Sequence, residues 1–308
     1  MNISKVKFIL LLIVLPWCHA VPADVVDKKM QLVGSTPGDQ EIKILLGIDP
    51  KTPVDFIRWN LVLTAPQVNS RAFTLNLQYG MSQPNTPGFI NNGTMLNITG
   101  RFSVVSKKIG NAESEVYQLV LSPSSTISLV RINENVFHLL SPDGSLMVGN
   151  GGWSYSLNKA GENVNVKRLT SFVQSAFANA DTSTRIIFDG RSPCKEIASD
   201  GRLSVAEDCF KLKWRFIFER DPKTLQPTRY TVERTDKRRS AIKGSWSLVT
   251  DNSKHTDAII YRLQPDDGSS VAYMLAGDHN VIFFLDKNLN LLTGNQEYSY
   301  AANRKLSK

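Results

Sequence analysis

The sequence is poor in the side chains that most often carry out chemistry. Its 308 residues include three cysteines, four histidines and six methionines. It has no Cys-x-x-Cys, no Met-x-x-Met array and no two histidines at a metal-ligand spacing, which excludes the common zinc and copper motifs. The nucleophile elbow of serine hydrolases and a complete phosphate-binding loop are also missing. We therefore expect a protein that is not an enzyme and has no catalytic, cofactor-binding or metal-binding residues.

Long apolar runs are missing everywhere except at the N-terminus. There Lys5 and Lys7 precede the apolar stretch Phe8–Val14, and small residues that suit cleavage follow at Ala20 and Ala23. This order of features is typical of a secretory signal peptide. The apolar stretch is too short to span a bilayer, which takes about 20 residues. We interpret residues 1–23 as a signal peptide and expect an exported protein, located in the periplasm, in the outer envelope or outside the cell.

The cysteines have distinct expected fates. Cys18 leaves with the signal peptide, and lipid attachment to it is disfavoured because Trp17 stands where a small residue is wanted. Cys194 and Cys209 remain, and a pair in an exported protein indicates a disulfide. Such a bond stabilises its domain by about 3 kcal/mol. A redox-active pair and a pair of metal ligands are the less favoured alternatives.

The net charge of +8 falls to +6 once Lys5 and Lys7 are removed with the signal peptide. Basic residues cluster only at Arg234–Arg239 and Asn303–Lys308. We interpret these clusters as a solvated turn and a tail rather than as a binding surface. The prediction is therefore that the protein has no nucleic-acid partner.

An internal repeat organises the chain. Asn135–Tyr155 and Asn280–Tyr300 align without a gap, with eight identical residues, and Gly100–Leu119 aligns with Gly244–Leu263. Similarity at a fixed offset indicates tandem copies of one structural unit. We therefore divide the chain into a first domain at 24–165, a helical or irregular linker at 166–184 and a second domain at 185–308.

Each copy contains short segments with alternating apolar and polar residues, the pattern of half-buried strands. In Phe210–Phe218, for example, Phe210, Leu212, Trp214, Phe216 and Phe218 share one face. The strands expected in the second copy are Arg185–Phe188, Phe210–Arg220, Arg229–Arg234, Ile242–Thr250, Ala258–Leu263, Val271–Ala276, Val281–Asp286 and Glu297–Ala302. Eight short strands with short connections predict a closed antiparallel barrel, with a β-sandwich as the alternative.

The second copy also carries a resemblance. The segments Phe188–Glu196, Phe210–Trp214, Gly244–Trp246 and Asn280–Tyr300 are similar to those of NlpE-type copper-resistance and envelope lipoproteins. The resemblance implies lipocalin-like barrels and a role in copper tolerance or in sensing stress at the cell envelope. The Cys-x-x-Cys of that family is absent here.

The fold class that we expect is therefore all-β, with two tandem eight-stranded lipocalin-like barrels. The expected function is binding of a protein partner or sensing at the envelope. Binding of a small apolar ligand or of copper by one barrel is the alternative. Interior volume distinguishes these possibilities, since small closed barrels are either filled by side chains or hold one ligand. The bulky residues expected to fill the second barrel are Trp214, Phe216, Trp246, Phe283 or Phe284, and Tyr298.

Overall fold

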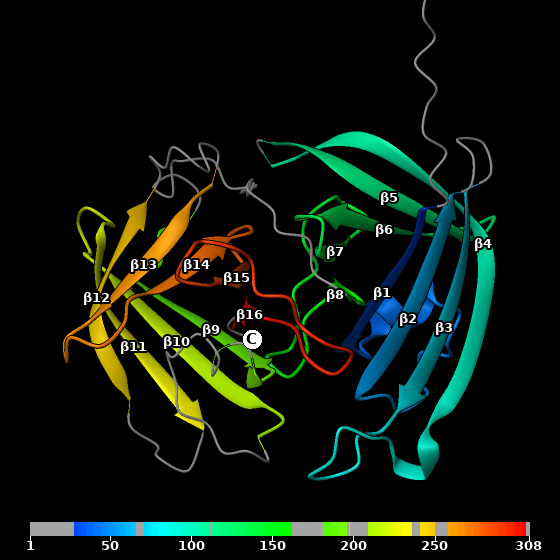
Figure 1. Ribbon diagram of the computed structural model, residues 1–308, viewed down its shortest axis with the longest axis horizontal. Helices are drawn as coiled ribbons and strands as arrows, with labels where there is room; N and C mark the ends of the chain where they lie inside the picture. The colour runs from blue at the N-terminus through cyan, green and yellow to red at the C-terminus, as the bar shows by residue number, and fades with distance from the viewer. Residues whose placement is uncertain are drawn as a thin grey trace, which may run out of the picture.

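The computed structural model describes residues 28–65, 71–110, 112–161, 181–195, 197, 209–235, 241–249 and 258–305. Two closed eight-stranded barrels lie side by side (Figure 1). The predicted all-β fold class and tandem antiparallel barrels are confirmed, and the sandwich alternative is wrong because each sheet closes on itself. Within the described ranges, no helix is both long and apolar enough to cross a bilayer.

The first barrel follows the order of the chain from strand to neighbouring strand. Its strands are β1 (Lys28–Pro37), β2 (Phe56–Ala65), β3 (Ala72–Gly80), β4 (Thr94–Ile109), β5 (Ala112–Ser122), β6 (Ser125–Arg131), β7 (Val136–Leu140) and β8 (Ser156–Lys159). β1 pairs with both β2 and β8, which closes the barrel. A 3₁₀ turn, η1 (Ile90–Asn92), lies between β3 and β4.

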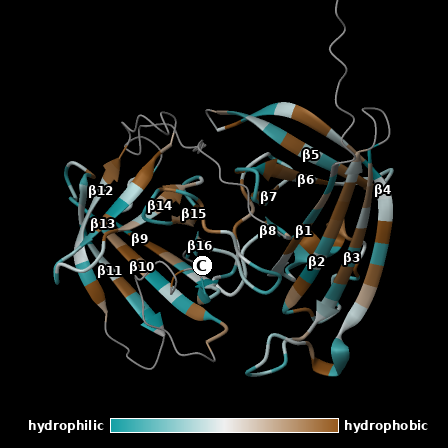
Figure 2. Cartoon of the chain, in the orientation of Figure 1, coloured by the Kyte–Doolittle hydropathy of each residue, from teal (hydrophilic) through white to brown (hydrophobic). Residues whose placement is uncertain are grey.

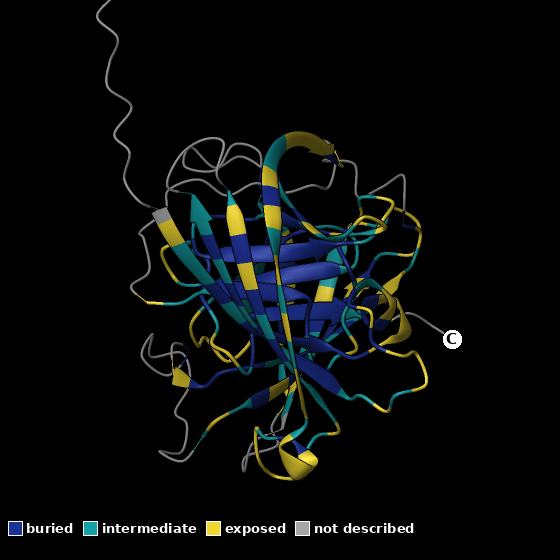
Figure 3. Ribbon diagram, turned by 90° about the vertical axis from the view of Figure 1, so that its right-hand side faces the viewer, coloured by how far each residue is buried: buried dark blue, intermediate teal, exposed yellow. Residues whose placement is uncertain are grey.

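The second barrel repeats this topology. Its strands are β9 (Arg185–Ser192), β10 (Leu212–Arg220), β11 (Pro227–Thr235), β12 (Ile242–Val249), β13 (Ile260–Pro265), β14 (Ala272–Ala276), β15 (Val281–Leu285) and β16 (Ala301–Arg304). Apolar and polar residues alternate along many of these strands (Figure 2). Buried residues gather in the strands and most exposed residues lie in the turns (Figure 3).

Equivalent glycines allow each barrel to close. A Cβ atom on Gly34 would lie 2.7 Å from the backbone oxygen of Ser156, and one on Gly190 would lie 2.7 Å from that of Ala301. No real Cβ comes this close to backbone, so the first and last strands of each barrel cross where only glycine fits. The glycine shared by the two copies is thus a requirement of the closed sheet.

A short helix closes one end of the first barrel. It is α1 (Gln40–Leu45), which begins after Asp39, whose side chain accepts a hydrogen bond from the backbone N–H of Ile42. Ile42 is fully buried in the barrel core. The Lys43 ammonium donates to the carbonyl of Pro50 at 2.6 Å, which satisfies its buried charge. This apolar segment is therefore a short helix whose buried side packs into the end of the barrel.

The last strand of the second copy begins later than the sequence predicts. The predicted strand is Glu297–Ala302, whereas β16 begins at Ala301 and its counterpart β8 begins at Ser156. Instead, the side chain of Asn150 accepts hydrogen bonds from the backbone N–H groups of residues 152 and 153, and Asn295 does the same for residues 297 and 298. These asparagine turns compete with the strand for backbone donors and delay it.

One further prediction differs from the structure. Phe210 lies before β10 and is 42% exposed, so the buried stripe of this strand starts at Leu212. β4 is long, because its ladder with β5 continues to Ile109 and Ala112. The predicted linker at 166–184 lies outside the described residues up to residue 180.

The disulfide prediction is confirmed. Cys194 and Cys209 are bonded, with their Cα atoms 6.0 Å apart. Cys194 is buried in the core of the second barrel. The bond links the end of β9 to the start of β10.

Candidate functional site

The interior of the second barrel is aromatic and unevenly filled. At one end, Phe218, Trp246 and Tyr261 pack with ring centroids about 5 Å apart. Towards the other end, Trp214 and Phe284 meet edge to face at 5.7 Å, and both contact Phe216. Edge-to-face contacts of this kind hold aromatic rings in defined positions.

A cavity of about 100 Å³ opens at this second end. Its walls are mainly apolar, and they include Trp214, Phe216, Phe284, Tyr230 and Met274. At its rim are the hydroxyl-bearing residues 269 and 270 of the turn between β13 and β14. An apolar cavity with a few polar groups at its mouth is the usual form of a small-molecule site.

The bulky residues expected to fill the barrel therefore have four different positions, and the prediction is wrong for Tyr298, which lines a hollow between the two barrels. Trp246 lies in the packed end, whereas Trp214, Phe216 and Phe284 border the cavity. Phe283, the neighbour of Phe284 in the chain, faces the other barrel and not the interior.

The repeat explains why a cavity exists in this barrel. Ala272, in the cavity wall, occupies the position of Ile127 in the first copy. Ile127 is 2% exposed in the core of the first barrel, where Ile42 of α1 also packs. The signal for the cavity in the sequence was therefore a small residue in one copy at the position of a large residue in the other. Bulky residues alone do not reveal it.

The two barrels join through an apolar interface with matching halves. Asn303 accepts a hydrogen bond from the backbone of Gly149 at 2.8 Å, and Asn158 accepts one from Gly294 at the same distance. Asn158 and Asn303 are equivalent in the repeat, as are the two glycines. The contact is thus self-complementary, as in a two-fold symmetric dimer.

His138 and Phe283 lie at the centre of this interface. They occupy the same position in the two copies and contact each other edge to face, at 5.7 Å. His138 is completely buried and bonds to the Ser156 hydroxyl and the Met147 carbonyl. Burial lowers its pKa to about 4. The imidazole is therefore neutral and packs within the interface.

Asp278 is an acidic residue within the same, mainly apolar interface. It accepts hydrogen bonds from the backbone N–H groups of Asn280 and Val281, and Asn133 does the same in the first copy. Burial raises the pKa of Asp278 to about 6, although backbone hydrogen bonds oppose the shift. In the unfolded chain the pKa of this carboxyl is near its usual value, so the folded state binds the proton more tightly.

We predict that Asp278→Asn stabilises the protein by about 3 kcal/mol at neutral pH and has little effect near pH 4. The native protein loses this stability as pH rises from about 4 through 6, because the buried carboxyl must ionise. Urea unfolding at a series of pH values measures the difference. The matched reverse variant, Asn133→Asp, should introduce the same loss. A constant difference across the series contradicts the assignment.

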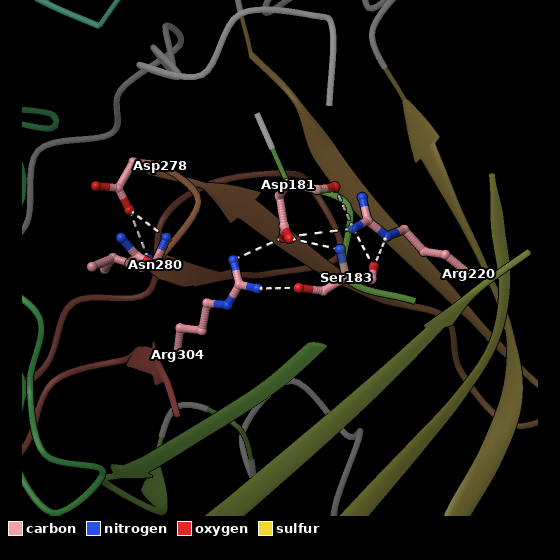
Figure 4. A network of polar contacts seen from close by, with 7 residues as sticks. Asp181, Ser183, Arg220, Asp278, Asn280 and Arg304 are labelled. Carbon is pink, nitrogen blue, oxygen red and sulfur yellow. Dashed lines mark hydrogen bonds and ion pairs between the residues drawn. The ribbon is translucent and has the colours of Figure 1, made fainter. Parts of the chain in front are cut away.

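A buried ionic network fixes the start of the second barrel (Figure 4). The carboxylate of Asp181 pairs with Arg304 at 2.8 Å and lies 3.6 Å from Arg220. Arg220 also donates to the carbonyls of Asp181 and Ser183, and Arg304 donates to the Ser183 hydroxyl at 2.9 Å. Asp181 and Ser183 belong to the predicted linker, and the network joins them to the ends of β10 and β16.

Metal-binding residues are not gathered in any described part of the chain, where no three His, Cys, Asp or Glu side chains come together. The two described cysteines are bonded to each other. His255, in a predicted turn, lies outside the described residues. Comparison with protein-family models, with curated proteins and with solved structures finds no match to this chain.

Proposed function

We propose that this is an exported, non-enzymatic binding protein whose second barrel takes up the apolar chain of a small amphiphile. The apolar cavity beside Trp214 carries the proposal. An apolar cavity of about 150 Å³ accepts benzene, so the smaller cavity of this barrel matches a short alkyl segment. Its open end leaves room for the polar head beside Ser269 and Ser270.

Two observations support export. The N-terminal pattern is that of a signal peptide, and the disulfide between Cys194 and Cys209 suits an oxidising compartment. The resemblance to NlpE-type proteins adds a role in sensing at the cell envelope. In that role, the occupied barrel would be the signal that is passed to a protein partner.

The binding proposal predicts quenching of Trp214 fluorescence by a brominated fatty alcohol. Bromine quenches an indole ring on contact, and Trp214 is the tryptophan that borders the cavity. Ala272→Ile should abolish the quenching, because it places the side chain of the first copy in the cavity. Thr126→Ile, on an exposed position of β6, adds a similar side chain elsewhere and should leave quenching intact.

The outcome depends on the difference between the two variants. Equal quenching in Ala272→Ile and in the native protein places the alcohol elsewhere and contradicts the proposal. The absence of quenching in the native protein contradicts it as well. Circular dichroism of both variants verifies that the barrels remain folded.

A further inference from the structure

A second hollow, of about 170 Å³, lies on the seam between the barrels. The first copy contributes Arg58 of β2, Trp153 and the turn at 82–87. The second copy contributes Arg191 of β9, Lys211 and Glu297. The hollow therefore exists only because the two copies pack together, and it is separate from the cavity inside the second barrel.

The walls of this hollow carry an excess of positive charge. Arg58, Arg191 and Lys211 line it, and Glu297 is the one carboxylate among those of its lining residues that the structure describes. Burial lowers the pKa of Lys211, and the neighbouring charges of Arg191 and Lys213 lower it further. Burial also lowers the pKa of Arg58, against the opposing attraction of Glu297. Positive charges that repel one another in a concave site favour the binding of an anion.

A neighbouring groove provides a contrast. Arg191 also lines a groove of about 370 Å³, together with Lys213 and Arg215. There, however, Asp189 holds Arg215 in a two-pronged ion pair at 2.8 and 2.9 Å, and Glu233 lies in the same wall. Carboxylates largely balance the cations of this groove, whereas the seam hollow keeps its excess.

The two arginines of the hollow are held in place by aromatic rings. Phe89, Phe56 and Trp153 form a continuous stack, with centroid distances of 4.0 and 4.7 Å. The guanidinium of Arg58 lies 5.2 Å from the Phe89 centroid, and that of Arg191 lies 5.1 Å from the Trp153 centroid. Cation–π contacts at this range orient a guanidinium without neutralising it. The arginines are thus positioned before any ligand arrives.

We propose that the seam hollow binds a small organic anion, about one sugar ring in size, through Arg58, Arg191 and Lys211. Its recognised group is a carboxylate or a phosphate, both of which accept charge-assisted hydrogen bonds from guanidinium and ammonium groups. The volume sets the size, since a cavity of about 150 Å³ holds a single six-membered ring.

Isothermal titration calorimetry of the whole mature protein with glucuronate, glucose 6-phosphate and glucose tests this. We expect both anions to bind and uncharged glucose not to bind. The tighter of the two anions identifies the preferred group. Binding should weaken with added salt, because charge attraction is screened.

Two variants with opposite expected effects make the test independent of folding. Lys211→Gln should weaken binding about tenfold, since it removes one charge-assisted hydrogen bond. Glu297→Gln should strengthen binding, because it removes the carboxylate that repels the anion, and a damaged fold would not produce a gain. Lys213→Gln, an exposed control in β10 two residues after Lys211, should leave binding nearly unchanged, because Lys213 does not line the hollow.

Several results would overturn the proposal. These are no binding of either anion, equal binding of glucose, or unchanged affinity in both Lys211→Gln and Glu297→Gln. Ala272→Ile should leave anion binding unaffected, because Ala272 lines the separate cavity inside the second barrel. Loss of anion binding in this variant would place the anion in that cavity and would also overturn the proposal.

Discussion

Replacing Asp181 with alanine should lower the free energy of unfolding by about 3–5 kcal/mol, because it removes the counter-charge of a buried arginine. Arg220 is 4% exposed and cannot turn to water. Arg304, the other partner, would also lose its shortest ion pair. The effect should appear in the second barrel, where the network ties residues 181–183 to β10 and β16.

Urea unfolding measures this loss, and its pH dependence identifies its origin. Burial by itself raises the pKa of Asp181, but hydrogen bonds from Arg304 and Ser183 outweigh it and hold the pKa at about 2. The stabilisation is therefore fully present above about pH 4 and disappears as pH falls towards 2. The difference in stability between the native protein and Asp181→Ala should thus narrow in acid by about 2 kcal/mol.

A surface pair supplies the matched control for Asp181. Arg229 and Asp266 form an ion pair in which both side chains are about half exposed. Solvent-exposed pairs contribute little, so Asp266→Ala should leave the unfolding midpoint almost unchanged. A comparable loss in both variants would mean that burial does not control the strength of the Asp181 network.

The second large effect is expected at Trp59. Trp59→Ala should cost about 3–5 kcal/mol, since the ring is fully buried and its indole N–H donates to Thr36 at 2.9 Å. Trp214 occupies the same position in the second copy and donates to Ser192 at 2.8 Å. It borders the cavity, however, so Trp214→Ala removes fewer packing contacts and should cost less.

Chemical denaturation of the two alanine variants gives the comparison directly. Trp59→Phe and Trp214→Phe are the controls, because each keeps one aromatic ring while it loses the indole N–H and part of the ring volume. They should each cost about 1–2 kcal/mol, less than Trp59→Ala. If Trp214→Ala proves as costly as Trp59→Ala, the mouth of the second barrel is closely packed in solution.

The sequence predicted the architecture because its strands alternate and its two copies repeat. Alternation in Leu212–Phe218 reflects a sheet with one buried face, and Gly34 and Gly190, which the structure places at the closure of each barrel, occupy equivalent positions in the two copies. The disulfide was predicted from the two cysteines that remain after the signal peptide and from the expected oxidising compartment. Alternation and cysteine content can be read directly from the residues, and the repeat is found by comparing the two halves of the chain. A single sequence is therefore enough to reveal all three.

The candidate sites were not predictable in the same way. Arg58, Trp153 and Lys211 are far apart in the chain, and only the packing of one barrel on the other brings them to one hollow. The position of Phe283 in the interface between the barrels was also not predictable, because every residue of β15 is apolar and buried. Alternation therefore does not show which of its side chains point into the barrel. A strand buried on both faces shows no period that tells the two faces apart.

The matching halves of the interface also have a kinetic consequence. A newly made first barrel exposes an apolar face whose natural partner, the second barrel, is part of the same chain. Covalent connection presents that partner at an effective concentration on the order of millimolar, which favours closure within one molecule. Two chains that exchange second barrels would nevertheless keep every contact of the interface, including those of Asn158 and Asn303. Crowded folding intermediates of this protein therefore have a direct route to domain-swapped dimers.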